Sequence, residues 1–373
     1  MNIGVVKEIK TDEFRVGLTP SNVEVLVQNA HKVFVQSSAG DGSGFSDAAY
    51  KKAGAMIVDS AKDLYDSASL IVKVKEPQPS EYEYLNESHT LFCYFHLVAF
   101  EELASVLVEK KVCAIAYETV SLKNELPLLK PMSEIAGKMA PIAAAFYLSR
   151  FKGGEGILIG GAVGVRSANV LVIGAGNAGY GAAKVAMGMG ADVTVMNRST
   201  PKLEKLQAIL PFAKTAIYSP QTLSELLQEA DIVIATVLIQ GGSSAPKLIS
   251  SDMLKSMKKG SIIVDVAIDQ GGVSVASKPT THREPIFTYE GVIHYCVANM
   301  PGAYPKTSTL ALTNATMPYV LKLANEGIKN AIKNDEALLL GVNALGGNIT
   351  NAAVASALGY EYKSAKELLR EIL

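Results

Sequence analysis

The segment from residue 170 to residue 198, VLVIGAGNAGYGAAKVAMGMGADVTVMNR, constrains the fold more than any other part of the sequence. Residues 170–173 form a β-favouring apolar run, and Gly174, Gly176 and Gly179 follow it at GxGxxG spacing before an alanine-rich helical pattern. The first glycine permits a tight turn, the second lets the backbone approach a pyrophosphate, and the third lets the helix pack closely on the strand. GxGxxG alone also marks ordinary turns. Here a strand before it, with a helix and a second strand after it, favours a dinucleotide-binding site.

The helix that follows this turn, and the end of the second strand, supply further candidate cofactor contacts. Free N–H groups and the positive end of the helix dipole face the phosphates, so Asn177 and Ala178 in the first turn are candidate cofactor contacts. The second strand ends at Asn197 and Arg198, where a NAD-selective site usually has an acidic residue for the ribose 2′-hydroxyl. An arginine beside a neutral residue suits a 2′-phosphate, with Lys202 as a further candidate contact, so NADP stays open beside NAD. The alternative is that both cations are ordinary solvated charges.

Length and composition limit the class of protein. A chain of 373 residues is long enough for two domains, and a net charge of −1 gives no electrostatic case for a nucleic-acid or membrane partner. Charged residues and glycines interrupt every apolar stretch before it reaches membrane-spanning length, and the first residues, MNIGVVKEIK, lack the pattern of a signal peptide. The 49% hydrophobic content predicts subunit contacts, and hence a homo-oligomer. Three scattered cysteines predict reduced thiols in a cytoplasmic protein.

Alternating strand and helix patterns divide the chain into two α/β domains. The first third repeats short apolar strands and helices, and a small-residue helical pattern then leads to the block around the glycine turn. The helical segment after residue 301 is too apolar to stand alone, so we expect it to pack back on the first domain. We therefore expect two Rossmann-like doubly wound domains with a cleft between them, joined by long helices. The expected bounds are residues 1–128 with 304–373 for the substrate domain and residues 129–303 for the dinucleotide domain.

Four polar residues stand where predicted strands end, which is where open parallel sheets place their ligands. They are Arg15, Lys75, His96 and Asp269. Two cations, a group that titrates near neutrality and a candidate base suit a small anionic substrate that undergoes proton transfer. Each also has a plainer interpretation: surface charges for the cations, a core histidine, and an aspartate that caps a turn. We predict no metal site, because no spacing typical of metal ligands occurs at the other histidines, which are His31, His89, His282 and His294.

Several longer motifs together resemble the alanine dehydrogenase family, which also includes the nicotinamide-binding subunit of transhydrogenase. The motifs are KEIKTDEFRVGLTP, VKVKEP, FHL, KPMSEIAGKMA, the glycine turn, DVAIDQGG, YCVANMP and PKTSTLALTNATMPY. The resemblance covers residues 1 to about 358. It implies NAD-dependent oxidative deamination of L-alanine to pyruvate and ammonium, two domains that close around the cofactor, and a hexamer.

The resemblance also implies roles for individual residues. Arg15 and Lys75 would bind the substrate carboxylate and carbonyl, His96 would be the general acid and base, and Asp269 would activate water or ammonia. The remaining residues would contact the cofactor; they are Ser133, Val237, Leu238, Asn299 and Met300.

This chain departs from the family pattern at two places. Asn197 and Arg198 replace the expected acidic residue, and Val273, Ser274 and Val275 follow DQGG where the family commonly has a cysteine, an aromatic residue and a glutamate. Three alternatives therefore remain beside alanine dehydrogenase. They are an NADP-preferring enzyme that acts on another small 2-oxo acid, a transhydrogenase-type dinucleotide-binding subunit, and a dinucleotide-binding protein without catalysis.

Overall fold

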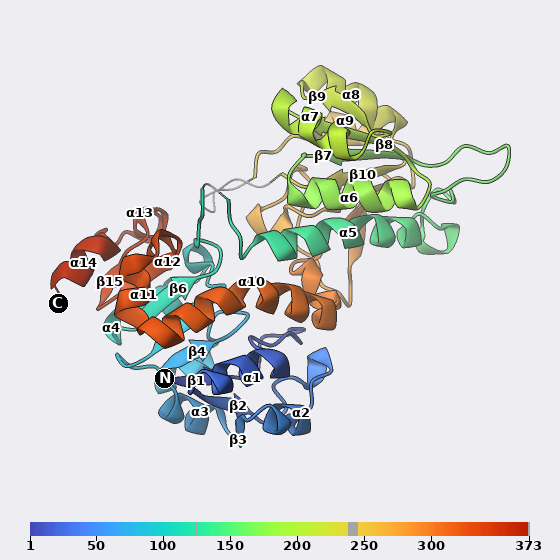
Figure 1. Ribbon diagram of the computed structural model, residues 1–373. Coiled ribbons are helices and arrows are strands. Elements are labelled where there is room, and N and C mark those ends of the chain that lie inside the picture. The colour runs from blue at the N-terminus through green and yellow to red at the C-terminus, as the bar shows by residue number, and fades with distance from the viewer. Residues whose placement is uncertain (124, 238–244, 372–373) are drawn as a thin grey trace. The chain divides into compact units, whose positions relative to one another are not determined.

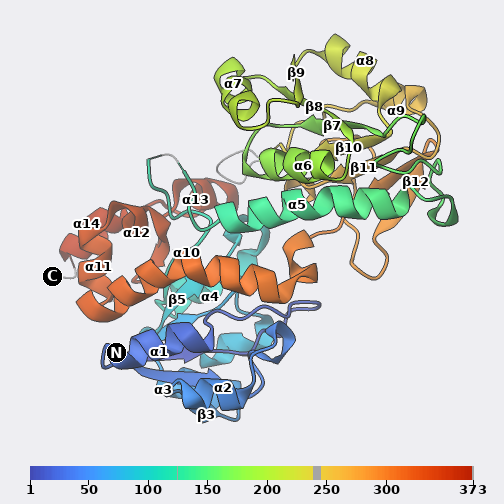
Figure 2. The same ribbon diagram turned by 45° about the vertical axis from the view of Figure 1, so that its right-hand side comes forward.

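The computed structural model describes residues 1–123, 125–237 and 245–371. The chain forms two compact units: unit 1 contains Met1–Met132 and Tyr304–Leu373, and unit 2 contains Ser133–Ala303. Figures 1 and 2 show the blue start and the red end of the chain within the same unit. The C-terminal segment therefore packs with the N-terminal strands.

Unit 1 is built on a sheet that has eight strands among the described residues, in the order β15-β14-β6-β5-β4-β1-β2-β3. Neighbouring strands from β6 to β3 are parallel, and β14 and β15 extend the sheet in antiparallel pairing. The strands are β1 Asn2–Val5, β2 Lys32–Gln36, β3 Met56–Val58, β4 Leu70–Val72, β5 Thr90–Cys93, β6 Cys113–Ala116, β14 Val342–Leu345 and β15 Asn348–Ile349. The helices are α1 Pro20–Gln28, α2 Asp47–Lys52, α3 Ala61–Ser67, α4 Glu101–Glu109, α10 Pro305–Glu326, α11 Ile328–Asn334, α12 Glu336–Gly341, α13 Ala352–Leu358 and α14 Ala365–Glu371.

Unit 2 is built on a second sheet, with seven described strands in the order β12-β13-β11-β10-β7-β8-β9. All neighbouring pairs are parallel except β12 with β13. The strands are β7 Asn169–Ile173, β8 Asp192–Asn197, β9 Lys214–Ile217, β10 Ile232–Ala235, β11 Ile262–Asp265, β12 Ile286–Tyr289 and β13 Val292–Tyr295. The helices are α5 Lys130–Tyr147, which begins at the end of unit 1, α6 Asn177–Gly188, α7 Thr200–Ile209, α8 Pro220–Glu229 and α9 Ser251–Ser256.

Both units have the strand order of a doubly wound fold, which confirms the predicted fold class. The parallel strands are almost wholly buried and apolar, as in β4, β5, β10 and β11. Strands that are covered on both faces need helices on both sides, and the alternating helices provide that cover.

The first strand and the first helix of unit 1 agree only partly with the local sequence pattern. Thr19 followed by Pro20, a hydroxyl residue before a proline, predicts a helix start, and α1 does begin there, with the Thr19 side chain accepting a hydrogen bond from Asn22 N at 3.3 Å. Residues 3–9, IGVVKEI, alternate in a way that predicts a strand, but the strand ends at Val5. The chain leaves the sheet there, and the acidic residue Glu8 turns into the interior, where it is 8% exposed.

Three features of the sheets were missed by periodicity. The C-terminal segment, which reads as helical, also forms β14 and β15, and the short β3 and the antiparallel edge strand β12 have no strong pattern of their own. These four strands have two to four residues, which is too few alternating positions to show the period of a strand.

Candidate active site

The strand order of each sheet reverses at one point, and ligands in open parallel sheets bind beyond the carboxyl ends of the strands at such a point. In unit 1 the reversal lies between β1 and β4, and in unit 2 it lies between β7 and β10. Arg15, Lys75 and His96 follow β1, β4 and β5, which are neighbours in the sheet. The fold therefore brings these three residues to one edge of the unit 1 sheet.

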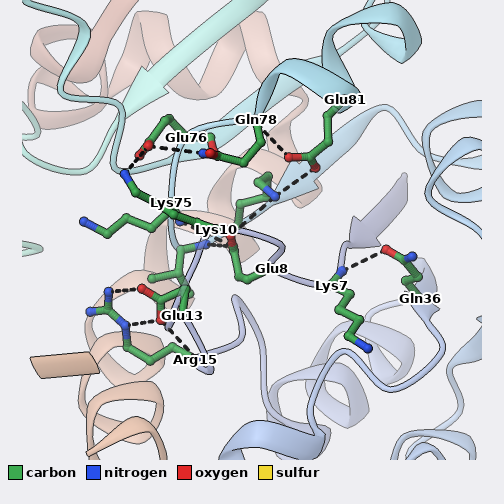
Figure 3. A network of polar contacts seen from close by, with 12 residues as sticks. Lys7, Glu8, Lys10, Glu13, Arg15, Gln36, Lys75, Glu76, Gln78 and Glu81 are labelled. Atoms are coloured by element: carbon green, nitrogen blue, oxygen red, sulfur yellow. Dashed lines mark hydrogen bonds and ion pairs between the residues drawn. The ribbon is translucent and has the colours of Figure 1, made fainter. Parts of the chain in front are cut away.

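Arg15 is a buried residue that forms an ion pair with Glu13, a residue that sequence reasoning missed (Figure 3). Its Nε donates to Glu13 Oε1 at 2.6 Å, and its Nη2 donates to Glu13 Oε2 at 2.5 Å. Its Nη1 also lies 3.1 Å from the sulfur of Met132. This two-point pairing fixes the plane of the guanidinium group, so the candidate carboxylate-binding cation has a defined orientation.

Lys75 is half-buried, and its main chain is held by the buried carboxylate of Glu8. Glu8 Oε1 accepts hydrogen bonds from Val74 N at 2.6 Å and from Lys75 N at 3.3 Å. The other oxygen of Glu8 lies 3.4 Å from the Nζ of Lys73, and that lysine also pairs with Glu81 at 3.0 Å. Figure 3 shows Glu8, Lys75 and Glu81 within one network of polar contacts. Lys73 is thus buried, while Lys75 keeps partial access to solvent.

Two of the buried glutamates of this network, Glu13 and Glu8, have opposite pKa shifts. Burial raises the pKa of Glu13, but the Arg15 guanidinium overcomes it and lowers the pKa to about 2. Burial raises the pKa of Glu8 to about 7, because the opposing attraction of Lys73 is weaker and the charges of Glu13 and Glu81 add to the increase. Glu13 therefore stays charged near neutral pH, whereas Glu8 changes protonation there.

His96 follows β5 and presents its side chain to solvent, with 43% of the side chain exposed. Its backbone is left-handed, with φ of 50° and ψ of 41°. Glu118, another residue that the sequence did not reveal, accepts hydrogen bonds from His96 N at 2.6 Å and from Phe95 N at 3.1 Å. The interpretation of His96 as a core histidine is therefore wrong, because its ring lies outside the core.

The glycine turn in unit 2 depends on very close backbone contacts. Gly174 has a φ of 114°, and a Cβ on Gly179 would lie 1.9 Å from the Gly174 carbonyl oxygen. The Thr236 hydroxyl donates to Ile173 O at 3.0 Å across the reversal point. Gly176, the N-cap of α6, has nothing within 4 Å of the position of a Cβ. The main chain at the start of α6 is therefore open to a phosphate, and this geometry fits a dinucleotide.

Helix α5 packs directly against the start of α6, along the face that also carries Ser133. A Cβ on Gly137 would lie 2.0 Å from Ala178 O, and one on Gly181 would lie 3.1 Å from Glu134 O. Ser133 precedes Gly137 by four residues and so lies on the same face of α5. Of the predicted residues in the first turn of α6, Asn177 is exposed and Ala178 is buried.

The polar pair at the end of β8 lies beside β9. Asn197 is the last residue of β8, and its carbonyl accepts a hydrogen bond from Tyr218 N at 3.0 Å. Arg198 is exposed, and its guanidinium carbon lies 5.0 Å from the centre of the Tyr218 ring. Lys202 is exposed in the first turn of α7. Tyr218 thus holds the arginine at the strand end by a cation–π contact.

Asp269 is exposed in a short 3-10 turn after β11, and the buried residue Asp265 organises its loop. Asp265 accepts hydrogen bonds from Ala267 N at 3.1 Å, Val273 N at 2.8 Å and the Ser277 hydroxyl at 2.6 Å. Burial raises the pKa of Asp265, and these hydrogen bonds oppose the increase. Asp265 supports the loop, and Asp269 is the aspartate available to a ligand.

The remaining predicted cofactor residues that the structure describes follow β10 and β13 in the chain. Val237 is half-buried after β10, and Leu238 lies outside the described residues. Asn299 has a φ of 57°, and its carbonyl oxygen lies 3.3 Å from His282 Nε2. Met300 is 3% exposed and packs in the hydrophobic core of the unit, so its side chain is a core residue.

The described residues, 1–123, 125–237 and 245–371, contain neither a candidate metal site nor a candidate membrane span. No group of three or more His, Cys, Asp or Glu side chains there could hold a metal ion, and none of the helices is long and apolar enough to cross a membrane. The three cysteines, Cys93, Cys113 and Cys296, are buried and free.

Two domain models match the chain. The model of the alanine dehydrogenase/PNT N-terminal domain matches residues 4–136, and that of the C-terminal domain matches residues 140–352. A Staphylococcus aureus (strain USA300) protein named alanine dehydrogenase 2 is 48% identical over 373 residues, which cover 99% of this chain and 100% of that protein. The Bacillus subtilis (strain 168) alanine dehydrogenase is 49% identical over 100% of this chain and 98% of its own length.

Solved structures are also similar to this chain. A structure of L-alanine dehydrogenase matches with a TM-score of 0.93 and 44% identity, covering 96% of this chain and 99% of that one. A transhydrogenase from Sinorhizobium meliloti matches with a TM-score of 0.80 and 24% identity over 95% of this chain and 100% of that one, a likeness that shows the fold. The resemblance noted in the sequence is therefore confirmed.

Proposed function

The chain belongs to the alanine dehydrogenase/PNT family, and we propose that it catalyses the reversible oxidative deamination of L-alanine to pyruvate and ammonium with a nicotinamide dinucleotide. The observation that carries this proposal is the alignment of Arg15, Lys75 and His96 at the carboxyl ends of adjacent strands in unit 1. The open start of α6 in unit 2 fits the cofactor.

The family resemblance supports a role for each of these residues in the chemistry. When bound, the nicotinamide accepts a hydride from the substrate Cα. Arg15 and Lys75 hold the substrate carboxylate and carbonyl, which fixes the direction of Cα. His96 takes the proton that the amine loses as the iminium ion forms, and Asp269 orients the water that adds to this ion and takes the proton that the water loses. Collapse of the carbinolamine, with a proton returned by His96, gives pyruvate and ammonium.

Initial rates test the reaction and separate it from its alternatives. The purified chain should oxidise NADH with pyruvate plus ammonium, and it should reduce NAD+ with L-alanine. Turnover with another small 2-oxo acid but not with pyruvate would show that alanine is not the substrate. No turnover with any amino acid, but hydride exchange between two dinucleotides in the presence of a membrane partner, would favour the transhydrogenase-type subunit.

A histidine pair tests the assignment of the acid and base. His96→Ala should lower kcat by roughly 10²–10⁴-fold, since it removes the group that transfers the proton. His31→Ala is the matched control, because His31 directly precedes β2 at the opposite, amino edge of the unit 1 sheet. Its kcat should equal that of the unaltered chain.

We propose further that the cofactor site accepts NADP(H) as well as NAD(H). The support is the neutral Asn197 followed by Arg198, whose guanidinium group the Tyr218 ring holds at the strand end. Arg198→Ala should raise the KM for NADPH much more than the KM for NADH, because only NADPH carries the 2′-phosphate. A strong preference of the unaltered chain for NADH would contradict this part of the proposal.

We also propose that the chain forms a homo-oligomer, a hexamer by its resemblance to the family. Large apolar side chains between the end of α5 and the start of β7 support self-association, because Phe151 is 99% exposed and Leu158 is 71% exposed. Light scattering coupled to size exclusion measures the mass directly.

A further inference from the structure

The backbone of each candidate substrate-side residue in unit 1 is bound by a glutamate. In each case a carboxylate oxygen accepts a hydrogen bond from the N–H of the residue itself. The bonds are Arg15 N to Glu13 Oε1 at 3.0 Å, Lys75 N to Glu8 Oε1 at 3.3 Å, and His96 N to Glu118 Oε1 at 2.6 Å. Arg15 and Lys75 lie within the ionic network of Figure 3. The contact of Glu118 with His96 joins the ends of β5 and β6, and it can be tested by changing Glu118 alone.

The backbone at His96 needs such support. Its φ of 50° is in the left-handed region, which a residue with a Cβ adopts only when its surroundings determine it. Glu118 Oε1 lies 2.6 Å from His96 N and 3.1 Å from Phe95 N, so a single oxygen holds two successive N–H groups. Because Glu118 follows β6, the strand next to β5, this contact ties the ends of two neighbouring strands together.

The ring of His96 is supported less directly. It stacks on the Tyr94 ring, with the centroids 6.0 Å apart and an interplanar angle of 9°. Tyr94 is itself fixed, because its hydroxyl donates to Leu128 O at 2.6 Å. Glu118 Oε1 is 4.0 Å from His96 Nδ1, which is too far for a hydrogen bond. The geometry is therefore that of a carboxylate that fixes the main chain and leaves the ring free to face a ligand.

We infer that Glu118 is a positioning residue for His96, and that it acts by accepting the main-chain hydrogen bonds that hold His96 in the left-handed conformation. The inference rests on the proposed function of His96 as acid and base. Small displacements of a reacting group are costly, so the loss of this contact should reduce turnover although Glu118 does not meet the substrate.

Three variants of the full-length protein separate the hydrogen bonds from the charge. Glu118→Ala removes both. Glu118→Gln removes the charge but keeps an amide oxygen that can accept from both N–H groups. Glu109→Ala, at the exposed end of α4, is the matched control for loss of a glutamate. The measurements are kcat and KM for alanine, cofactor affinity, and hydrogen exchange of the peptide that contains Phe95 and His96.

The expected result is that E118A exchanges the His96 amide faster and loses up to roughly 10²-fold in kcat, with cofactor affinity unchanged as evidence of folding. E118Q should restore amide protection and most of kcat, and E109A should match the unaltered chain. The inference is overturned if E118Q loses as much kcat as E118A while its amide stays protected, since the charge would then be the cause. It is also overturned if E118A changes neither exchange nor kcat.

These outcomes are distinct from a failure of the proposed function. Full activity of H96A would refute the role of His96 in proton transfer, and with it the catalytic purpose of the contact. Hydrogen exchange in E118A reports on the contact itself and does not depend on turnover.

Discussion

The two sheets reverse their strand order at equivalent points, but different interactions hold the chain at the two points. Between β1 and β4 in unit 1, the chain buries a charged pair, with Arg15 2% exposed and Glu13 5% exposed. Between β7 and β10 in unit 2, Gly174, Gly179 and Thr236 meet through main-chain atoms and a hydroxyl. An ion pair fixes the side chains at the reversal point of unit 1, and close main-chain contacts fix the turn at the reversal point of unit 2.

This difference matches the ligands proposed for the two points. A small carboxylate substrate needs a cation whose direction is fixed in advance, and a buried ion pair fixes it at the cost of desolvation. A pyrophosphate binds main-chain N–H groups at the start of a helix, which requires that side chains be absent there. The comparison therefore predicts that charge substitutions disturb unit 1 and that added carbon atoms disturb unit 2.

The largest effect should come from breaking the ion pair in unit 1. Glu13→Gln leaves the guanidinium group of Arg15 buried without its counter-charge, and loss of one partner of such a pair costs about 3–5 kcal/mol. The stability that Glu13 supplies is present above its ordinary pKa of 4.5 and is lost as the pH falls towards its folded value of about 2. Thermal unfolding of both proteins at pH 7 and pH 3 should therefore show the larger difference at pH 7.

Two further variants sharpen this result. Glu13→Gln combined with Arg15→Met removes both charges and should recover most of the lost stability, because the isolated charge is the cause of the cost. Asp66→Asn breaks the ion pair between Lys62 and Asp66 on the surface of α3, where both side chains are more than half exposed. Solvent screens that pair, so the unfolding transition should not move. An equal loss in the two single variants would show that burial does not matter.

Glu8 should give a smaller effect with the opposite dependence on pH. Its folded pKa of about 7 lies above the ordinary 4.5, so its contribution to stability is present below pH 4.5 and is lost as the pH rises through 7. At about 1.4 kcal/mol per pKa unit, the loss amounts to about 3 kcal/mol. Glu8→Gln resembles the protonated form, so its stability relative to the unaltered chain should increase between pH 5 and pH 8. A constant difference across this range would contradict the shift.

Sequence patterns predicted the features of the fold that repeat along the chain or depend on neighbouring residues. The strand–helix alternation predicts both doubly wound sheets, and the hydroxyl followed by proline predicts the start of α1. Spacing also places Gly174 and Gly179 in a tight turn, as the close contacts of these residues show. These features depend on neighbours in the chain, which a sequence displays directly.

Contacts between distant parts of the chain could not be read in this way. Glu118 lies 22 residues from His96, and Glu8 lies 67 residues from Lys75, so nothing in the local pattern joins them. An acidic residue at the end of a buried strand, as Asp265 is in β11, or just past it, as Glu118 is after β6, is the signal that could have indicated these two residues. Gly137 was overlooked for a similar reason. Its lack of a side chain matters because it allows close contact with Ala178 in another helix, and the pattern of its own helix does not show this.

The smallest change in stability should come from the glycine turn, where one added carbon atom tests the comparison. In Gly179→Ala the new Cβ would lie 1.9 Å from Gly174 O and 2.8 Å from Gly174 C. The turn must shift to accept it, and such overpacking costs about 1–3 kcal/mol. Both the unfolding temperature and the affinity for the dinucleotide, measured by calorimetry, should fall.

Gly176→Ala is the matched variant and should separate folding from binding. A Cβ on Gly176 meets no atom within 4 Å, so the unfolding temperature should hardly change. If the pyrophosphate approaches the main chain here, the same Cβ should weaken dinucleotide binding by roughly tenfold, or ~1.4 kcal/mol. Unchanged affinity in G176A, beside reduced affinity in G179A, would mean that the cofactor depends on the shape of the turn and does not contact Gly176. Reduced affinity in both, with stability reduced only in G179A, would show that the second glycine serves the ligand and the third serves the fold.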